Sequence, residues 1–180
     1  MVLDAGWNVL MHNRAAGRIF ERSVAVPALA EFSSSTGLNF LRLVCDPRGM
    51  RNRIRNWPHV GRALLARLRR ETFAYPGGPS ELLLRDLLTH EQLPPFSAGE
   101  PPLEAVMPVE LDLGDNCLRL FNTLTTFGTP QDIVLQELRI EMSFPADNPS
   151  DAILREWETH ASALASNSSA QALWKTNLQS

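Results

Sequence analysis

The chain has 180 residues, of which 44% are hydrophobic and 21% are charged, enough to bury one full hydrophobic core but hardly two. No apolar run approaches the roughly 20 residues that a membrane-spanning helix needs, and the N-terminus lacks the pattern of a signal peptide, so we expect a soluble cytoplasmic protein without membrane association. The net charge of -3 argues against a free-standing nucleic-acid binder, whose affinity comes mainly from neutralising phosphates.

The N-terminal segment predicts a strand pair followed by a helix. Residues 2–3 and 7–12 are apolar enough for two strands, and residues 4–6 between them contain the Asp and Gly of a tight turn. Asn13 then predicts a helix N-cap, because its side-chain carbonyl can accept a hydrogen bond from an amide of the first turn.

The middle of the chain predicts helices. Residues 38–44 are apolar enough for a buried helix, after which Asp46 and Pro47 offer a cap and a first-turn proline for a restart. Residues 57–73 place their apolar side chains on one stripe at about 100° per residue, and residues 80–88 also have leucines at helical spacing. Such stripes cover a core or a pocket.

Positive charge is concentrated in this helical part. Nine arginines lie between Arg42 and Arg70, with Asp46 as the only acidic residue among them. One interpretation is a docking face for DNA, an anionic ligand head or an acidic partner; the other is an ordinary solvated helix surface.

The second half of the chain predicts an antiparallel sheet. After a proline-rich connection over residues 94–108, residues 109–113 alternate apolar and acidic side chains, as a strand does. Residues 118–147 predict a long hairpin that turns at residues 128–132, where Gly and Pro interrupt the pattern. Residues 152–164 predict a last helix, before a polar tail that we expect to be frayed.

The second strand of this hairpin alternates with a period of two, as a half-buried strand does. We assign its apolar members to the buried side and its polar members to solvent. The apolar members are Val134, Leu138, Ile140, Met142 and Phe144, and the polar members are Glu137, Arg139, Glu141 and Ser143. The two glutamates beside Arg139 could perform acid–base chemistry, but such a face normally carries cross-strand ion pairs in water.

Motifs that would identify an enzyme or a metal site are missing. The four histidines have no metal-binding spacing, and the sequence has no Cys-x-x-Cys, no Gly-rich phosphate loop and no Gly-x-Ser-x-Gly elbow. Cys45 and Cys117 lie far apart and predict free thiols rather than a disulfide framework. We therefore expect no catalytic residues, no metal and no cofactor.

Four short blocks, in this order, resemble the MmyB-like ligand-binding domain, which follows an Xre-type helix-turn-helix in many bacterial transcription regulators. The blocks are residues 7–16 (WNVLMHNRAA), residues 39–43 (NFLRL) with 46–48 (DPR), residues 56–57 (NW) running into ALLARLRRE, and residues 124–147 (LTTFGTPQDIVLQELRIEMSFPAD). The resemblance covers about nine-tenths of the chain.

The resemblance implies an α+β, PAS-like fold over residues 1–165, in which an antiparallel sheet and flanking helices enclose a pocket, followed by a poorly ordered tail over residues 166–180. It implies a small apolar ligand, such as a fatty acid, whose occupancy changes how the domain positions, or dimerises with, its DNA-binding partner. No helix-turn-helix precedes the first predicted strand, so we expect an excised domain or a shortened gene product that contacts DNA only through a missing domain. The sequence leaves open whether the domain forms a homodimer.

Within the implied fold, large apolar side chains shared between the helices and the sheet are candidate pocket residues. They are Phe40, Trp57, Leu64 and Phe73 from helices, and Phe121, Leu138, Ile140 and Met142 from strands. Each has the alternative interpretation of an ordinary core residue. If the ligand carries a carboxylate, Arg42, Arg53 and Arg55 are candidates to hold it by charge-assisted hydrogen bonds.

Two other functions are left open beside the apolar-effector sensor. One is a dimerisation or partner-docking module whose core is filled by its own side chains and that binds no small molecule. The other is a small α+β enzyme with an enclosed cavity, for which a buried polar cluster with shifted pKa values would be the sign.

Overall fold

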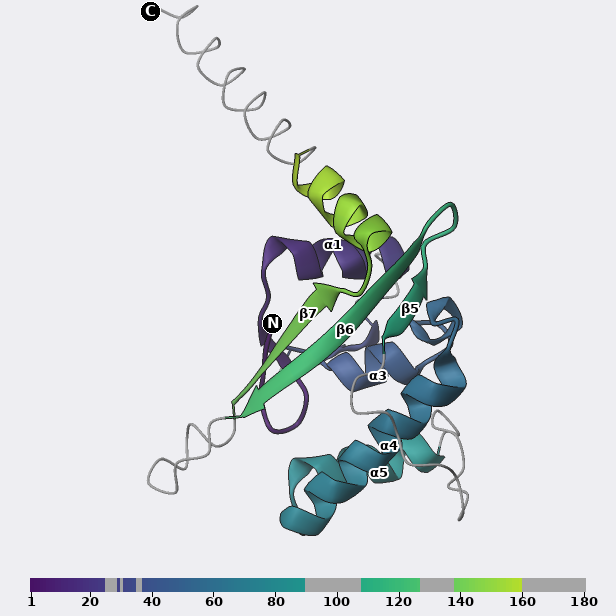
Figure 1. The fold of residues 1–180 in the computed structure, drawn as a ribbon. Helices are drawn as coiled ribbons and strands as arrows, with labels where there is room; N and C mark the ends of the chain where they lie inside the picture. Colours follow the sequence, from purple (N-terminus) through teal and green to yellow (C-terminus); the bar gives the residue numbers. More distant parts are fainter. Residues whose placement is uncertain (25–28, 30, 35–36, 90–107, 127–137, 160–180) are drawn as a thin grey trace, which may run out of the picture.

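A computed structural model describes residues 1–24, 29, 31–34, 37–89, 108–126 and 138–159. The fold is α+β, as predicted: an antiparallel sheet of five strands packs against helices (Figure 1). The strands of this sheet are β1 (Val2–Leu3), β2 (Val9–Met11), β5 (Val109–Asp112), β6 (Cys117–Thr126) and β7 (Arg139–Pro145), in the spatial order β2-β1-β7-β6-β5. The first strand of the chain therefore pairs with the last strand.

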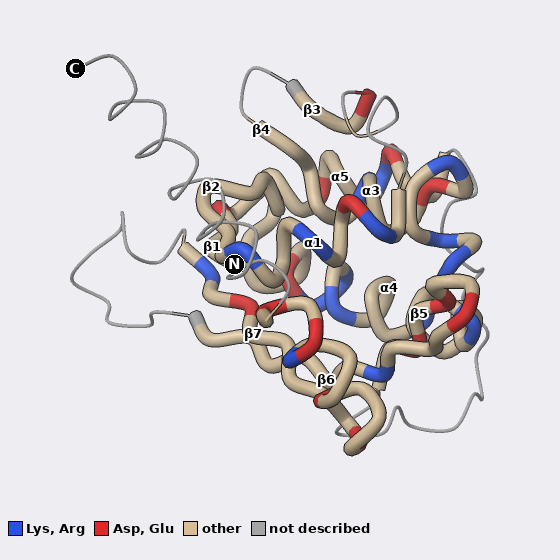
Figure 2. The backbone as a smooth tube through the Cα atoms, turned by 90° about the horizontal axis from the view of Figure 1, so that it is seen from above, with Lys and Arg blue, Asp and Glu red and all other residues tan. Residues whose placement is uncertain are grey.

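The described helices are α1 (Arg14–Ser23), α3 (Phe40–Cys45), α4 (Trp57–Ala74), α5 (Pro79–Thr89) and a final helix over residues 148–159, with a short 3-10 helix, η1 (Arg51–Arg53), before α4. A two-stranded sheet of β3 (Ser33–Ser34) and β4 (Gly37–Leu38) precedes α3. Seen from above in Figure 2, the strands β7, β6 and β5 lie along one side and the helices α1, α3, α4 and α5 on the other. In the described parts of the chain, no helix is long and apolar enough to cross a membrane.

Local sequence signals explain where most of these elements begin. Asn13 caps α1, since its Oδ1 accepts a hydrogen bond of 2.9 Å from the Ala16 amide. Asn39 caps α3 in the same way at 3.1 Å from the Arg42 amide, so this helix begins two residues later than predicted. The predicted stripe of α4 is confirmed, because Val60, Leu65 and Leu68 are buried.

Three local predictions differ from the structure or fall outside it. Trp7 is not in a strand but in the preceding turn, with φ at 66°, and its side chain is buried. Asp46 accepts from the Arg48 amide within a turn over residues 46–50, and no α-helix restarts at Pro47. The hairpin turn at residues 128–132, most of the connection over residues 94–108 and the tail after residue 159 lie outside the described residues.

The hydrophobic core lies between the inner face of the five-stranded sheet and the helices. One cluster joins Phe20 of α1 and Val60 of α4 to Leu111, Leu118 and Leu120 of the sheet. A second cluster lies toward α5 and contains Leu3, Leu41 and Leu87. Met1, Phe40, Trp57 and Leu64 pack against both clusters, and the first, second and fourth of these also line the cavity described below.

Candidate ligand-binding pocket

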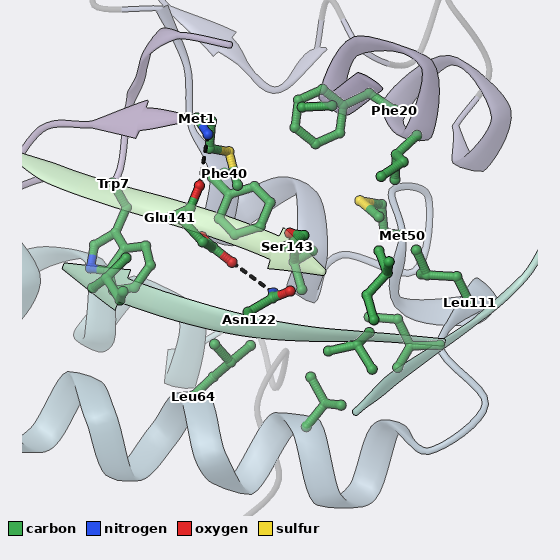
Figure 3. A pocket seen from close by; sticks show the side chains of 18 of the residues that line it. Met1, Trp7, Phe20, Phe40, Met50, Leu64, Leu111, Asn122, Glu141 and Ser143 are labelled. Atoms are coloured by element: carbon green, nitrogen blue, oxygen red, sulfur yellow. Dashed lines mark hydrogen bonds between the residues drawn. The ribbon is translucent and has the colours of Figure 1, made fainter. Parts of the chain in front are cut away.

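A cavity of about 180 Å³ lies between the sheet and the helices (Figure 3). Its walls are mainly apolar and come from distant parts of the chain, including Phe20 of α1, Phe40 of α3, Met50 and Leu64. Its polar lining consists of Arg67 from α4, Asn122 and Thr123 from β6, and Glu141 and Ser143 from β7. An apolar cavity with a few convergent polar groups is the usual form of a small-molecule site.

Glu141 and Ser143 of β7 face this cavity, and the assignment of faces from the sequence is therefore wrong. Glu141 is only 7% exposed, whereas Met142 and Phe144 are 41% and 40% exposed on the opposite face. The register agrees, because Glu141 lies opposite Leu124 and Ser143 lies opposite Asn122, and all four residues line the cavity. Successive residues of a strand point to opposite faces, so placing Glu141 inward places Ile140, Met142 and Phe144 outward.

Glu141 is a buried carboxyl group with half of its hydrogen-bonding capacity used. Its Oε1 accepts a hydrogen bond of 2.7 Å from Asn122 Nδ2, while its Oε2 is buried without a hydrogen-bond partner among the described residues. Burial raises the pKa of Glu141 to about 7, although the charge of Arg67 and the Asn122 hydrogen bond oppose that rise. In Figure 3, the Glu141, Ser143 and Asn122 side chains point from the sheet toward the space that Phe40 also borders.

A charged cluster next to the cavity is organised around Glu71 of α4. Its carboxylate accepts hydrogen bonds from Trp7 Nε1 at 3.1 Å, Arg67 Nε at 3.1 Å and Ser80 Oγ at 2.8 Å. Arg139 Nη1 lies 3.2 Å from Glu71 Oε2, and burial lowers the pKa of Arg139. The guanidinium carbons of Arg67 and Arg139 also lie 5.1 and 4.9 Å from the Trp7 ring centre. Both arginines thus share Glu71 as their counter-ion.

The structure brings only two of the eight apolar candidates to this cavity, Phe40 and Leu64. Trp57 packs against both core clusters, and Phe73 is 90% exposed at the end of α4. Phe121 stacks on Phe144 with ring centres 5.2 Å apart. The remaining candidates, Leu138, Ile140 and Met142, do not line the cavity either, and the reversed face of β7 explains the last two.

The three candidate arginines do not line the cavity. Arg42 donates a hydrogen bond to Asp86 of α5, and Arg55 holds Asp112 of β5 at 3.0 and 3.1 Å. Arg53 is exposed in η1. The first two contacts show arginines of the basic segment engaged in surface ion pairs within the molecule, which favours the interpretation as a solvated surface.

Signs of metal or thiol chemistry are not found in the described residues. They contain no group of three or more His, Cys, Asp or Glu side chains that could hold a metal ion. Both cysteines are free, as predicted, and burial raises the pKa of Cys45 to about 12, which keeps this thiol protonated.

Three comparisons with known proteins bear on what the cavity is for. A family model described as "MmyB-like transcription regulator ligand binding domain" matches residues 1–156. This range contains the four sequence blocks and every residue that lines the cavity. No curated protein and no solved structure matches the chain.

Proposed function

Because this chain belongs to the family of MmyB-like transcription regulator ligand-binding domains, we propose that its cavity binds a small, largely apolar effector of a bacterial Xre-type regulator. Occupancy of the cavity would change how the domain is positioned against, or dimerises with, a DNA-binding partner. DNA contact would belong to a helix-turn-helix domain outside these residues, and a cytoplasmic location would follow from that role. The observation that carries this proposal is the cavity between the sheet and the helices.

The size of the cavity limits the effector. Its volume of about 180 Å³ is below the roughly 300–1,000 Å³ of sites for drug-sized ligands. A compact molecule or a short acyl chain fits this space. A long fatty acid would need additional space, so we place that class second.

The origin of the walls supports a sensing role. Strands β6 and β7 supply one side of the cavity, while α1, α3 and α4 supply the other. A molecule between these layers contacts both, and its binding energy can favour one arrangement of the helices over another. Regulation then requires only that the two arrangements differ in affinity for the effector. The PAS-like description of this layered fold is part of the same proposal.

Binding explains the cavity better than catalysis does. Glu141 is a buried group with a raised pKa, the sign expected for an enzyme. However, the one hydrogen-bond partner of its carboxyl group in the described residues is the side-chain amide of Asn122, which neither titrates nor acts as a nucleophile. A single carboxyl group of this kind recognises a ligand, and we propose that the domain is not an enzyme.

The proposal can be tested by mass spectrometry of an organic extract from the purified, folded protein. We expect a compound in stoichiometric amount from the native protein and its loss from Leu64→Trp, which adds bulk inside the cavity. The matched control is Leu88→Trp, which adds the same bulk where Leu88 is 38% exposed on α5.

Equal recovery from the native protein and both variants would contradict the proposal. So would the failure of every extracted compound to raise the melting temperature when it is added back. Either result would favour a docking module whose core is filled by its own side chains.

A further inference from the structure

The polar part of the cavity carries an acceptor that the protein itself leaves unused. Glu141 Oε2 is buried and has no hydrogen-bond partner in the described residues, although Oε1 is held by Asn122. Burying a polar atom without a hydrogen-bond partner destabilises the fold by more than a typical hydrogen bond stabilises it. Such atoms are therefore uncommon in folded proteins. A ligand in the cavity that donates to Oε2 would remove this cost.

The cationic groups near Glu141 are directed to partners other than its carboxylate. Arg67 and Arg139 both lie beside the Glu71 carboxylate, which Trp7 and Ser80 also contact. Glu141, in contrast, forms no ion pair of 4.0 Å or less within the described parts of the chain. A buried carboxylate without a counter-ion is strongly disfavoured unless a cation joins it. No cation of the described residues therefore contacts the Glu141 carboxylate, and Oε2 is left open to a positively charged donor.

From these two observations we propose that the effector is a compact amine with an apolar body, and that its ammonium group binds the Glu141 carboxylate inside the cavity. This inference rests on the proposed function and names its ligand class. The ammonium group would donate to Oε2 in a charge-assisted hydrogen bond, which is stronger than a bond between neutral groups. Asn122 would hold the carboxylate in place through Oε1.

The rest of the cavity suits the apolar body of such a molecule. Phe20 and Phe40 lie with ring centres 6.2 Å apart, and both line the cavity with Met50 and Leu64. The Glu141 side chain is buried beside this apolar lining, and an interaction with a cation is stronger there than in water. A molecule with a six-membered ring and a short amine arm matches a cavity of about 180 Å³.

The protonation of Glu141 sets how this recognition depends on pH. The charged groups that influence it are Arg67 from α4 and the Met1 amino group at β1, which both favour the carboxylate, while burial favours the neutral acid. Arg139 on the same strand forms an ion pair with Glu71 on α4, next to Glu141. Because the Glu141 pKa is about 7, the carboxylate that binds an ammonium group is mostly formed at pH 8 and mostly protonated at pH 6.

Calorimetric titration of the full chain with four molecules that share a phenylethyl group tests the inference. The probes are 2-phenylethylamine, 2-phenylethanol, ethylbenzene and 3-phenylpropionate. At pH 8 we expect the amine to bind at least about tenfold more tightly than the alcohol, and its affinity to fall about tenfold on going to pH 6. Glu141→Gln should remove both effects, while Asp115→Asn, which removes one negative charge at an exposed turn, should retain them.

The remaining outcomes separate this inference from the proposed function. Equal binding of amine, alcohol and ethylbenzene would overturn the amine inference and leave the apolar sensor standing. Tighter binding of 3-phenylpropionate, increasing toward pH 6, would also overturn it, in favour of a carboxylate ligand that pairs with protonated Glu141. No binding of any probe at millimolar concentration would contradict the cavity as a binding site, and with it both proposals.

Discussion

Glu141 places a carboxyl group on the inner face of β7, the central strand of the sheet, at a buried position where an apolar side chain is usual. Its buried carboxyl group has a pKa of about 7 instead of 4.5, so the folded chain binds this proton more tightly than the unfolded chain does. The contribution of Glu141 to the free energy of unfolding therefore falls as pH rises from about 4.5 to about 7. A carboxyl group in a salt bridge behaves in the opposite way, because its contribution falls as pH is lowered. Because the Glu141 carboxylate lowers folding stability near neutral pH, we expect this residue to serve ligand binding rather than the fold.

This cost leads to a prediction about stability. Glu141→Gln should raise the free energy of unfolding by up to about 3 kcal/mol at pH 8, which corresponds to the difference between the two pKa values, and by close to zero at pH 4.5. Urea denaturation at the two pH values measures this, with Asp115→Asn as the control. A variant that is less stable than the native chain at pH 8 would show that Glu141 is structurally required rather than tolerated.

At the scale of the elements, the sequence predicted the existence of strands and helices better than their orientation. The caps at Asn13 and Asn39, the stripe of α4 and the alternation in β7 are local signals, and each predicted an element that the structure contains. Alternation identifies two faces of a strand but does not say which face is inward. Hydrophobicity favoured the face of Met142, and the structure places that face outward.

The information that decides the orientation of β7 lies elsewhere in the chain. Arg139 can be buried only because Glu71 and Trp7 surround it, and Glu141 only because Asn122 donates to it. These partners are 19 or more positions away along the sequence, beyond the reach of a periodicity argument. One signal was available: Asn122 interrupts an otherwise apolar face formed with Leu118, Leu120 and Leu124, as a polar residue in a pocket does.

The orientation of the sheet can be checked by a matched pair of substitutions. Leu118→Ala should lower the free energy of unfolding by about 2–5 kcal/mol, because this side chain is 0% exposed in the core. Met142→Ala should cost less than about 1 kcal/mol, because its side chain is 41% exposed on the outer face. Comparable costs in chemical denaturation would contradict the orientation of β7 described here.

At the scale of the whole molecule, the cavity results from the order in which the strands assemble. The central position of β1 and β7 in the sheet brings Met1 next to Glu141, where their backbones exchange hydrogen bonds of 2.7 and 3.0 Å. Helices α1, α3 and α4 then cover the same face of the sheet. The α+β class could be predicted from the sequence, and the resemblance correctly identified the family. Of the pocket candidates, only Phe40 and Leu64 line the cavity, because its walls depend on long-range pairing.

The arrangement of methionines allows the most direct test of a ligand site between sheet and helices. Met1 and Met50 line the cavity, whereas Met11 and Met142 are exposed at 68% and 41%. Methyl NMR of protein labelled at its methionines, titrated to saturation with 2-phenylethylamine, should shift the Met1 and Met50 signals and leave those of Met11 and Met142 unchanged. Shifts confined to Met11 and Met142, or the absence of any shift at a concentration where calorimetry detects binding, would contradict a ligand site in this cavity.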